Sequence, residues 1–384
     1  MSVINTTRAI APEFAARAAE GEQLRTMPAE LVARVRQAGL FRIAVPRSLG
    51  GLECDPVTVI EIIEEISRAD GSAGWTVAIG NSVAFFAWLE PLVVTEMLGG
   101  DREIVSTGVF APMGRAVRDG GDFVLTGRWP FNSGCMHADW FQTGFFVMDG
   151  DRPAVRPDGN LDWRFAFYRR EQAEIIDTWH TLGLRGTGSH DVAVHALRIP
   201  ESHTAMPFYD PPRHESALLA LGFSEFTAAI LSGIPLGIAR RALDELEALA
   251  PTKRRPNRET TIAEDAHAQL QVGRAEGALL SARAFVVDAF GDAWDHVRTT
   301  GAPTPKQQGE MLLSMQQAMD ASLQAVDVAY EFTGASAVFD DNPIGRCWRD
   351  LHTARQHVVF SGYRTTEYAR TRFEIQSPVH SRAA

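Results

Sequence analysis

The chain has 384 residues, of which 45% are hydrophobic and 22% are charged, a composition that fits a globular protein with two or three packed units. Its net charge of −11 argues against a nucleic-acid partner, because phosphate binding needs a basic surface. The three cysteines, Cys54, Cys135 and Cys347, lie far apart and form no Cys-x-x-Cys pair. This spacing argues against a disulfide framework and a zinc ribbon, and we expect a cytoplasmic protein without a metal.

The N-terminus and the most apolar segment argue against a membrane protein. Arg8, Glu13 and Arg17 interrupt any signal-peptide core. The apolar run from Trp75 to Leu89 is too short to cross a bilayer, and we expect a buried helix there.

Residues 1–100 are expected to form an N-terminal helical domain. One predicted helix begins at Pro28 and stops at Gly39. A second, between Val57 and Ile66, places four branched apolar residues on one face. The segment Asp70–Ser72 ends that helix, and the hydroxyl of Ser72 is able to cap the next one.

Residues 101–212 are expected to form a small central antiparallel β-domain. Glycine, proline and turn residues become frequent, and short apolar or alternating runs occur at 123–125, 140–147 and 192–199. A Gly-Gly turn at 120–121 between apolar residues predicts a hairpin.

Residues 213–384 are expected to form a C-terminal four-helix bundle. Apolar residues recur at steps of three and four along one long predicted helix: Ala275, Leu279, Ala282, Val286, Ala289, Ala293 and Val297. Breaks at 251–256, 301–305 and 334–343 divide the region into four helices, as in an antiparallel bundle. The predicted fold class is therefore α+β and mostly α, in the order helices, β-domain, bundle.

The segment Gly127–Trp140 is the most informative part of the sequence, and it reads GRWPFNSGCMHADW. It ends a predicted strand and brings aromatic rings, the hydroxyl of Ser133 and the close-approach backbone of Gly134 together. These groups suit a planar, hydrogen-bonding heterocycle such as an isoalloxazine ring. From the residues alone, an ordinary strand and turn remains the alternative.

Two other motifs are weak. Gly186–Gly188 begins like a dinucleotide-binding Gly-x-Gly-x-x-Gly motif, but Asp191 stands at the last glycine position and no βαβ pattern surrounds it. We therefore expect no nicotinamide site. The basic cluster Lys253–Arg255 with Arg258 is typical of a solvated turn, and a phosphate site is the alternative.

Two further segments carry a resemblance to a known family. Gly39–Leu52 is similar to the Gly-Leu…Val-Pro…Gly-Gly-Leu pattern of acyl-CoA dehydrogenases, and Asn342–Asp350 to the Pro-x-x-Arg-x-x-Arg-Asp start of their last long helix. With the order of the domains, these segments resemble the acyl-CoA dehydrogenase fold over nearly the whole chain. In many dehydrogenases a catalytic glutamate follows the Arg-Asp pair by eight residues, where this chain has Val358. A glutamate on an earlier helix, used by some members, keeps acyl-CoA dehydrogenase as the alternative.

The segment Gly127–Trp140 resembles the flavin-facing strand of the reduced-flavin monooxygenases built on the same fold, such as para-hydroxyphenylacetate hydroxylases and the phenol hydroxylases of steroid breakdown. Trp179–Asp191 and His357 are also similar to their patterns. The resemblance implies the oxygenase component of a two-component enzyme. Reduced FMN or FAD, supplied by a separate reductase, would react with O2 to a C4a-hydroperoxide that hydroxylates a phenol or an indole.

The resemblance also implies a homotetramer. N- or S-oxygenation on the same scaffold remains open, as does a non-catalytic flavin-binding protein.

The resemblance assigns roles to particular residues. The hydroxyl of Ser133 would lie near flavin N5, and a neutral His357 would take a proton from the substrate. Asp70 would lie near the active site. The other predicted cofactor-binding residues are Phe110, Trp129, Phe131, Asn132 and Gly134, and the predicted substrate-binding residues are Trp75 and Phe85 with His357.

Each role has a structural alternative. Ser133 can serve a turn, His357 a helix, and Asp70 a helix end, while aromatic residues at helical spacing are often core. A metal site of His352 and His357 is unsuitable, because on a helix they point about 140° apart. Asp350 and His357 would share a face of that helix, about 10 Å apart.

Overall fold

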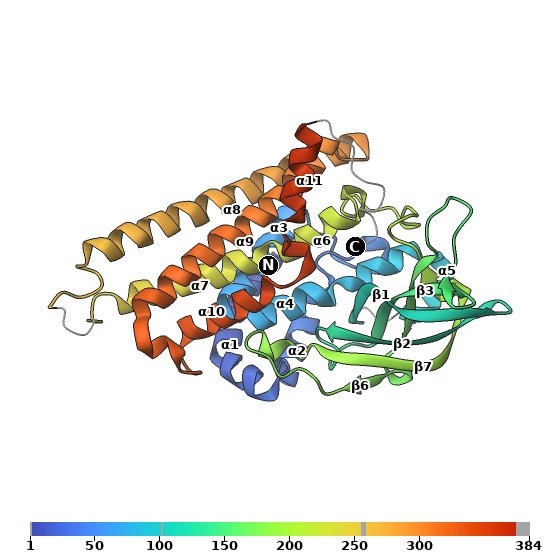
Figure 1. Ribbon diagram of the computed structural model, residues 1–384, viewed down its shortest axis with the longest axis horizontal. Helices are drawn as coiled ribbons and strands as arrows, with labels where there is room; N and C mark the ends of the chain where they lie inside the picture. The colour runs from blue at the N-terminus through green and yellow to red at the C-terminus, as the bar shows by residue number, and fades with distance from the viewer. Residues whose placement is uncertain (1, 101–102, 255–258, 374–384) are drawn as a thin grey trace.

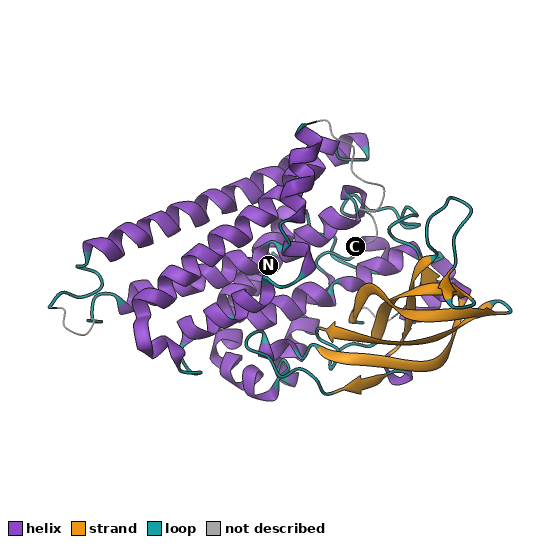
Figure 2. Ribbon diagram, viewed as in Figure 1, coloured by secondary structure: helices purple, strands orange, loops and turns teal. Residues whose placement is uncertain are grey.

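The computed structural model describes residues 2–100, 103–254 and 259–373 (Figure 1). Arg255 and Arg258 of the basic cluster lie outside these residues. Helices fill most of the molecule, and a single β-sheet lies at one end (Figure 2). A large core of apolar side chains joins the N-terminal helices to the C-terminal ones, and a second, smaller core lies within the sheet.

Five helices precede the sheet: α1 (Val3–Leu24), α2 (Ala29–Gln37), α3 (Pro56–Ala69), α4 (Gly71–Gly80) and α5 (Pro91–Leu98). The side chain of Asp55 caps α3 by accepting the N–H of Thr58, and the predicted apolar face of α3 is buried. Asp70 ends α3 and caps α4 by accepting the N–H of Ser72, so the cap of α4 is the aspartate and not the serine.

The apolar run after residue 75 is buried as expected, but it is not one α-helix. It changes at Asn81 into the 3-10 helix Ser82–Trp88. The buried amide of Asn81 accepts the N–H of Ala44 and donates to the carbonyl oxygens of Leu40 and Val77. These bonds to a separate segment fix the change of direction.

The sheet has eight strands: β1 (Ser106–Asp119), β2 (Asp122–Asn132), β3 (Trp140–Asp149), β4 (Arg152–Pro153), β5 (Trp163–Arg169), β6 (Glu174–Ile176), β7 (His190–Pro200) and β8 (Thr204–Ala205). Their order is β6-β7-β2-β1-β3-β5-β8, and β4 pairs with β3. The sheet was expected to be antiparallel, and all pairs are except one: β1 and β3 run parallel. After the β1–β2 hairpin, residues 133–139 carry the chain past β1 to its other side, where β3 starts in the direction of β1. The sheet is therefore mixed.

The C-terminal part contains α6 (Phe223–Leu231), α7 (Gly233–Leu249), α8 (Ala266–Thr300), α9 (Pro305–Thr333), α10 (Pro343–Ala354) and α11 (Tyr363–Arg372). All seven residues of the predicted stripe on α8 are buried. Helix α7 approaches α3 closely, because a Cβ at Gly233 would lie 2.4 Å from the carbonyl oxygen of Ile60. The run Phe223–Leu249 is long and apolar enough to cross a membrane by length and composition alone, but 83% of its most apolar window is buried inside the protein, as in a core helix.

Helix α10 is shorter than the sequence pattern indicates. It ends at Ala354, and His357 instead begins the 3-10 helix Val358–Phe360. The guanidinium of Arg355 donates to the carbonyl oxygen of Phe360 at 2.5 Å, which holds the turned segment. The prediction that His357 shares a helix with Asp350 and His352 is therefore wrong.

Candidate active site

The end of β2 has an unusual backbone conformation. Phe131 and Gly134 have φ angles of +65° and +73°. A phenylalanine rarely adopts this conformation, and such outliers are concentrated at functional sites. The N–H of Gly134 donates to the carbonyl oxygen of Thr187 at 2.8 Å, which ties the strand end to the 3-10 helix Arg185–Thr187. Ser133 lies between these fixed points.

Three hydroxyl groups form a continuous hydrogen-bonded chain, which we call the hydroxyl chain. Oγ of Ser133 lies 2.7 Å from Oγ of Ser189, which lies 2.6 Å from Oγ1 of Thr187. Thr187 Oγ1 donates to the carbonyl oxygen of Leu184 at 2.8 Å. Ser133 Oγ also accepts the indole N–H of Trp75 at 2.9 Å. All five residues are buried.

His357 joins this site through Trp75. The imidazole meets the indole edge to face, with ring centroids 5.4 Å apart and an interplanar angle of 73°. Three predicted site residues from α4, the end of β2 and the segment after α10 therefore lie together: Trp75, Ser133 and His357.

The protein environment fixes the charge of His357. The residue as a whole is exposed, although protein surrounds the ring closely enough to disfavour its charged form. This desolvation lowers the pKa of His357 to about 4, so the ring is neutral at pH 7. Its Nδ1 accepts the N–H of Val359 at 3.3 Å. By this geometry the hydrogen of the neutral ring lies on Nε2, which is a donor.

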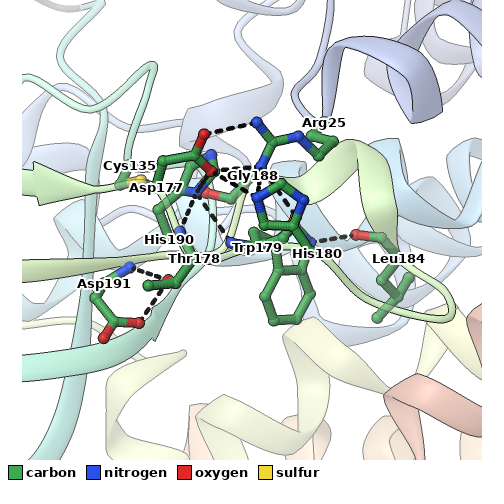
Figure 3. A network of polar contacts seen from close by, with 10 residues as sticks. All are labelled: Arg25, Cys135, Asp177, Thr178, Trp179, His180, Leu184, Gly188, His190 and Asp191. Atoms are coloured by element: carbon green, nitrogen blue, oxygen red, sulfur yellow. Dashed lines mark hydrogen bonds and ion pairs between the residues drawn. The ribbon is translucent and has the colours of Figure 1, made fainter.

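A network of polar contacts braces the loop that carries Thr187 and Ser189 (Figure 3). The guanidinium of Arg25 donates to the carboxylate of Asp177 at 2.5 and 2.8 Å and holds the pKa of Asp177 at about 2. Nδ1 of His190 accepts the N–H groups of residues 178 and 179 at 3.3 and 3.2 Å.

Further contacts in the same loop involve Trp179 and Cys135. The indole of Trp179 donates to the carbonyl oxygen of Leu184 at 2.9 Å, and the thiol of Cys135 donates to that of Gly188 at 3.2 Å (Figure 3). None of these bonds uses a hydroxyl of the hydroxyl chain. The loop would therefore keep these bonds in a variant that lacks one of the three hydroxyl groups.

Asp70 is half-buried and lies in a separate group with the buried Asp350. Both line a cavity of about 30 Å³ together with Arg346. Burial and the nearby charge of Asp70 raise the pKa of Asp350 to about 8. Burial raises the pKa of Asp70 to about 6, against the opposing effect of Arg346. Oδ1 of Asp350 accepts the N–H of Leu184 at 2.6 Å, so Asp350 also supports the loop.

The remaining predicted cofactor residues are divided between the site and the sheet. Phe131 is 65% exposed and lies edge-on to Trp179, with centroids 6.1 Å apart. Trp129 is fully buried in the sheet core, where its indole donates to the carbonyl oxygen of Gly144 at 2.8 Å. The amide nitrogen of Asn132 donates to the carbonyl oxygen of Trp129 at 2.7 Å, and Asn132 is fully buried.

Phe85 and Phe110 belong to an aromatic cluster. Their ring centroids lie 4.8 Å apart, and Phe110 stacks on Phe165 at 4.8 Å with an interplanar angle of 6°. Phe85 also contacts Phe223 at 5.1 Å. Among the described residues, the ring contacts of Phe85 and Phe110 lie within this cluster and do not extend to Trp75 or His357.

The residues at the strand end fit a flavin. Phe131 presents an exposed aromatic face beside Ser133. Two buried polar atoms next to Ser133 and Gly134, Oδ1 of Asn132 and Oγ1 of Thr107, have no hydrogen-bond partner within the described part of the chain. Such unsatisfied groups call for a bound partner or water. Within the same residues, no group of three or more His, Cys, Asp or Glu side chains is arranged to hold a metal ion.

The sequence interpretation did not assign roles to Thr187, Ser189 and Asp350. The match of Trp179–Asp191 to the family pattern contained two of these residues, but the contact of Ser189 with Ser133 joins positions 56 apart. Asp350 was considered as part of the Arg-Asp motif and in relation to His357, but without a contact to this loop.

Comparisons with known proteins agree with the architecture. The model of the acyl-CoA dehydrogenase N-terminal domain matches residues 3–90, and that of the C-terminal domain matches residues 229–362. The indole-3-acetate monooxygenase of Pseudomonas putida is 35% identical over 95% of this chain and 91% of its own length. The flavin-dependent monooxygenase oxygenase subunit HsaA of Rhodococcus jostii is 27% identical over 91% of this chain and 92% of its own length.

A solved structure leads to the same family. XiaF from Streptomyces sp., in complex with FADH2 and glycerol, superimposes with a TM-score of 0.87 and 25% identity, and the match covers 98% of this chain and 96% of the XiaF chain. One relative is 35% identical over nearly the full length of both chains, and the two family models match the expected parts of the fold. This chain therefore belongs to the flavin-dependent monooxygenases built on the acyl-CoA dehydrogenase fold.

Proposed function

We propose that the chain is the oxygenase component of a two-component monooxygenase that hydroxylates an aromatic small molecule of the indole or phenol class. The observation that carries this proposal is the meeting of Ser133, Trp75 and His357 at the strand end. Two relatives support the substrate class and the separation into oxygenase and reductase components, since one is named for indole-3-acetate and the other as an oxygenase subunit. A separate reductase supplies the reduced FMN or FAD.

The bound flavin supplies two electrons to O2, so that one oxygen atom enters the substrate and the other leaves as water. Phe131 and Gly134 are proposed to hold the ring, with Ser133 at N5. The buried surroundings of Ser133 exclude water from its hydroxyl, and a fixed dipole in such a site is not displaced by solvent.

His357 is proposed to contact the substrate. Because the ring is neutral and Nδ1 is occupied by the N–H of Val359, Nε2 donates a hydrogen bond to an oxygen or nitrogen of the substrate. Taking a proton from a phenol instead requires the ring to leave Val359, which makes the base role the second candidate for this residue.

We also propose a cytoplasmic homotetramer. The outer face of α8 supports a contact between copies, because Leu270 and Leu280 are more than half exposed there and a Cβ at Gly273 or Gly277 would meet nothing within 4 Å.

One experiment tests the function. The purified protein is mixed with anaerobically reduced FMN or FAD and then with ¹⁸O2 and indole-3-acetate or a simple phenol, and the products are analysed by mass spectrometry. A product two mass units heavier than the ¹⁶O2 product is expected. Bleaching of oxidised flavin by an acyl-CoA, without oxygen incorporation, would instead establish a dehydrogenase. Flavin retention with neither result would establish a binding protein.

A further inference from the structure

The hydroxyl chain has a direction that follows from its two ends. The carbonyl oxygen of Leu184 can only accept, so the hydroxyl of Thr187 donates to it. Thr187 Oγ1 therefore accepts from Ser189, because each hydroxyl has a single hydrogen to donate.

The same reasoning reaches Ser133. Ser189 has used its hydrogen on Thr187, so it accepts the hydrogen of Ser133. The indole of Trp75 is a donor only and takes up one lone pair of Ser133 Oγ. What remains on Ser133 is one free lone pair, which makes its oxygen an acceptor toward any ligand.

This polarity distinguishes the two oxidation states of a flavin. N5 of a reduced flavin carries a hydrogen and donates, whereas N5 of an oxidised flavin has only a lone pair. We propose that Thr187 and Ser189 are positioning residues that hold Ser133 as an acceptor, and thereby make the site select the reduced flavin over the oxidised flavin. This proposal rests on the proposed function, which places Ser133 at N5.

The proposal predicts the behaviour of variants that leave Ser133 untouched. Thr187→Val removes the acceptor of the Ser189 hydrogen, and Ser189→Ala removes the acceptor of the Ser133 hydrogen. In both variants the hydroxyl of Ser133 is free to turn toward N5 and donate. Thr187→Ser keeps the hydroxyl at position 187 and should keep the direction.

The experiment measures equilibrium dissociation constants for reduced and oxidised FMN and FAD, the former under anaerobic conditions, with the full-length protein. The wild type should bind the reduced form more tightly. The ratio of interest is the dissociation constant of the oxidised flavin divided by that of the reduced flavin. In Thr187→Val and Ser189→Ala this ratio should fall about tenfold, the effect of one hydrogen bond. The midpoint potential of the bound flavin should fall by about 30 mV, the same tenfold change for a two-electron couple.

A matched control removes a buried threonine hydroxyl elsewhere. Thr143→Val in β3 loses a contact with the hydroxyl of Tyr168 at 3.3 Å, which is not part of the hydroxyl chain, and the ratio should stay at the wild-type value. Thermal unfolding of all variants identifies any that fail to fold, in which case Ser189→Ala and Thr187→Ser decide the result.

The outcomes separate the two proposals. Folded Thr187→Val and Ser189→Ala proteins with the wild-type ratio would overturn the role of the hydroxyl chain and leave the monooxygenase function intact. A Thr187→Ser protein with a lowered ratio would also overturn it. A wild type that binds neither form of flavin would overturn the proposed function itself.

Discussion

Two polar groups support the same loop, and they differ in kind. The hydroxyl chain of Ser133, Ser189 and Thr187 is uncharged, while the pair Asp70 and Asp350 is ionisable. The first group acts through the direction of its hydrogen bonds, which pH does not change. The second acts through its charge state, so its contribution to stability depends on pH. The hydroxyl chain, proposed to select the ligand, should therefore act in the same way at every pH, whereas the support that Asp70 and Asp350 give the loop should depend on pH.

The largest expected effect concerns His357, the site residue that belongs to neither group. His357→Ala should lower product formation about 10²- to 10⁴-fold with flavin binding unchanged, the usual range for a lost acid–base or hydrogen-bonding group. His357→Asn keeps an N–H donor, so it should recover part of the activity if the ring donates from Nε2. Product yield per reduced flavin measures both variants.

Equal losses in the Ala and Asn variants would show that His357 acts as a base. Full activity of His357→Ala would remove it from catalysis. Because burial lowers the pKa of His357 to about 4, any loss of activity caused by its protonation should occur below pH 5 rather than near pH 6.5.

Ser133→Ala tests the neutral group directly. Loss of the hydroxyl removes the partner of Trp75 and of Ser189 and any contact with N5. We expect a roughly ten- to hundredfold fall in the ratio of hydroxylated product to hydrogen peroxide. The two products are measured together in one reaction. An unchanged ratio would show that Ser133 does not control the fate of the oxygen.

Asp350→Asn tests the ionisable group. The pKa values of Asp350 and Asp70 are raised to about 8 and about 6, above about 4 for an unfolded aspartate, so the folded protein holds more protons between pH 4 and 8. Wild-type stability should therefore fall as pH rises through this window. The asparagine carries no charge and can still accept the N–H of Leu184.

The variant should gain on the order of 1–2 kcal/mol in unfolding free energy at pH 8.5 relative to the wild type, and much less at pH 4.5. Denaturant unfolding at the two pH values measures this difference. Parallel stability curves for the two proteins would mean that the pKa of Asp350 is not raised in the folded protein.

The smallest expected effect concerns the backbone at the strand end. Gly134→Ala places a methyl group 3.4 and 3.5 Å from the methyl groups of Thr76 and Thr107, which is ordinary contact. The loss in unfolding free energy therefore comes from the φ angle of +73° and should be about 1 kcal/mol. Denaturant unfolding measures it, with Gly121→Ala in the open β1–β2 turn as the control. A loss of 3 kcal/mol or more would indicate a steric clash instead.

The sequence predicted those features that are encoded locally. The buried stripe of α8 and the end of α3 at Asp70 follow from the spacing of apolar residues and from the helix-breaking segment that begins at Asp70. The parallel pairing of β1 with β3 could not be predicted, because strand order depends on contacts between distant segments. The end of α10 was missed because neither glycine nor proline stands between Ala354 and His357, and the turn depends on Arg355 and Phe360.

The site was predicted to a similar extent. The motif around Ser133 identified the strand end, and the structure brings Trp75 and His357 to it. Trp129 was grouped with Ser133 by sequence, yet Trp129 lies in the sheet core, and the register of β2 against β7 shifts between Trp129 and Asn132. A shift of this kind re-aims side chains and is not visible in the sequence pattern. The hydroxyl chain was beyond prediction, since it joins two segments more than fifty residues apart.

The uncharged character of the hydroxyl chain has a consequence for engineering. Exchanging one threonine for valine would weaken the preference for reduced flavin about tenfold, at a residue that the proposal does not place in contact with the flavin and without altering net charge. A protein designer who wants a site for the oxidised cofactor would then change this one side chain and leave the residues that contact the flavin unchanged.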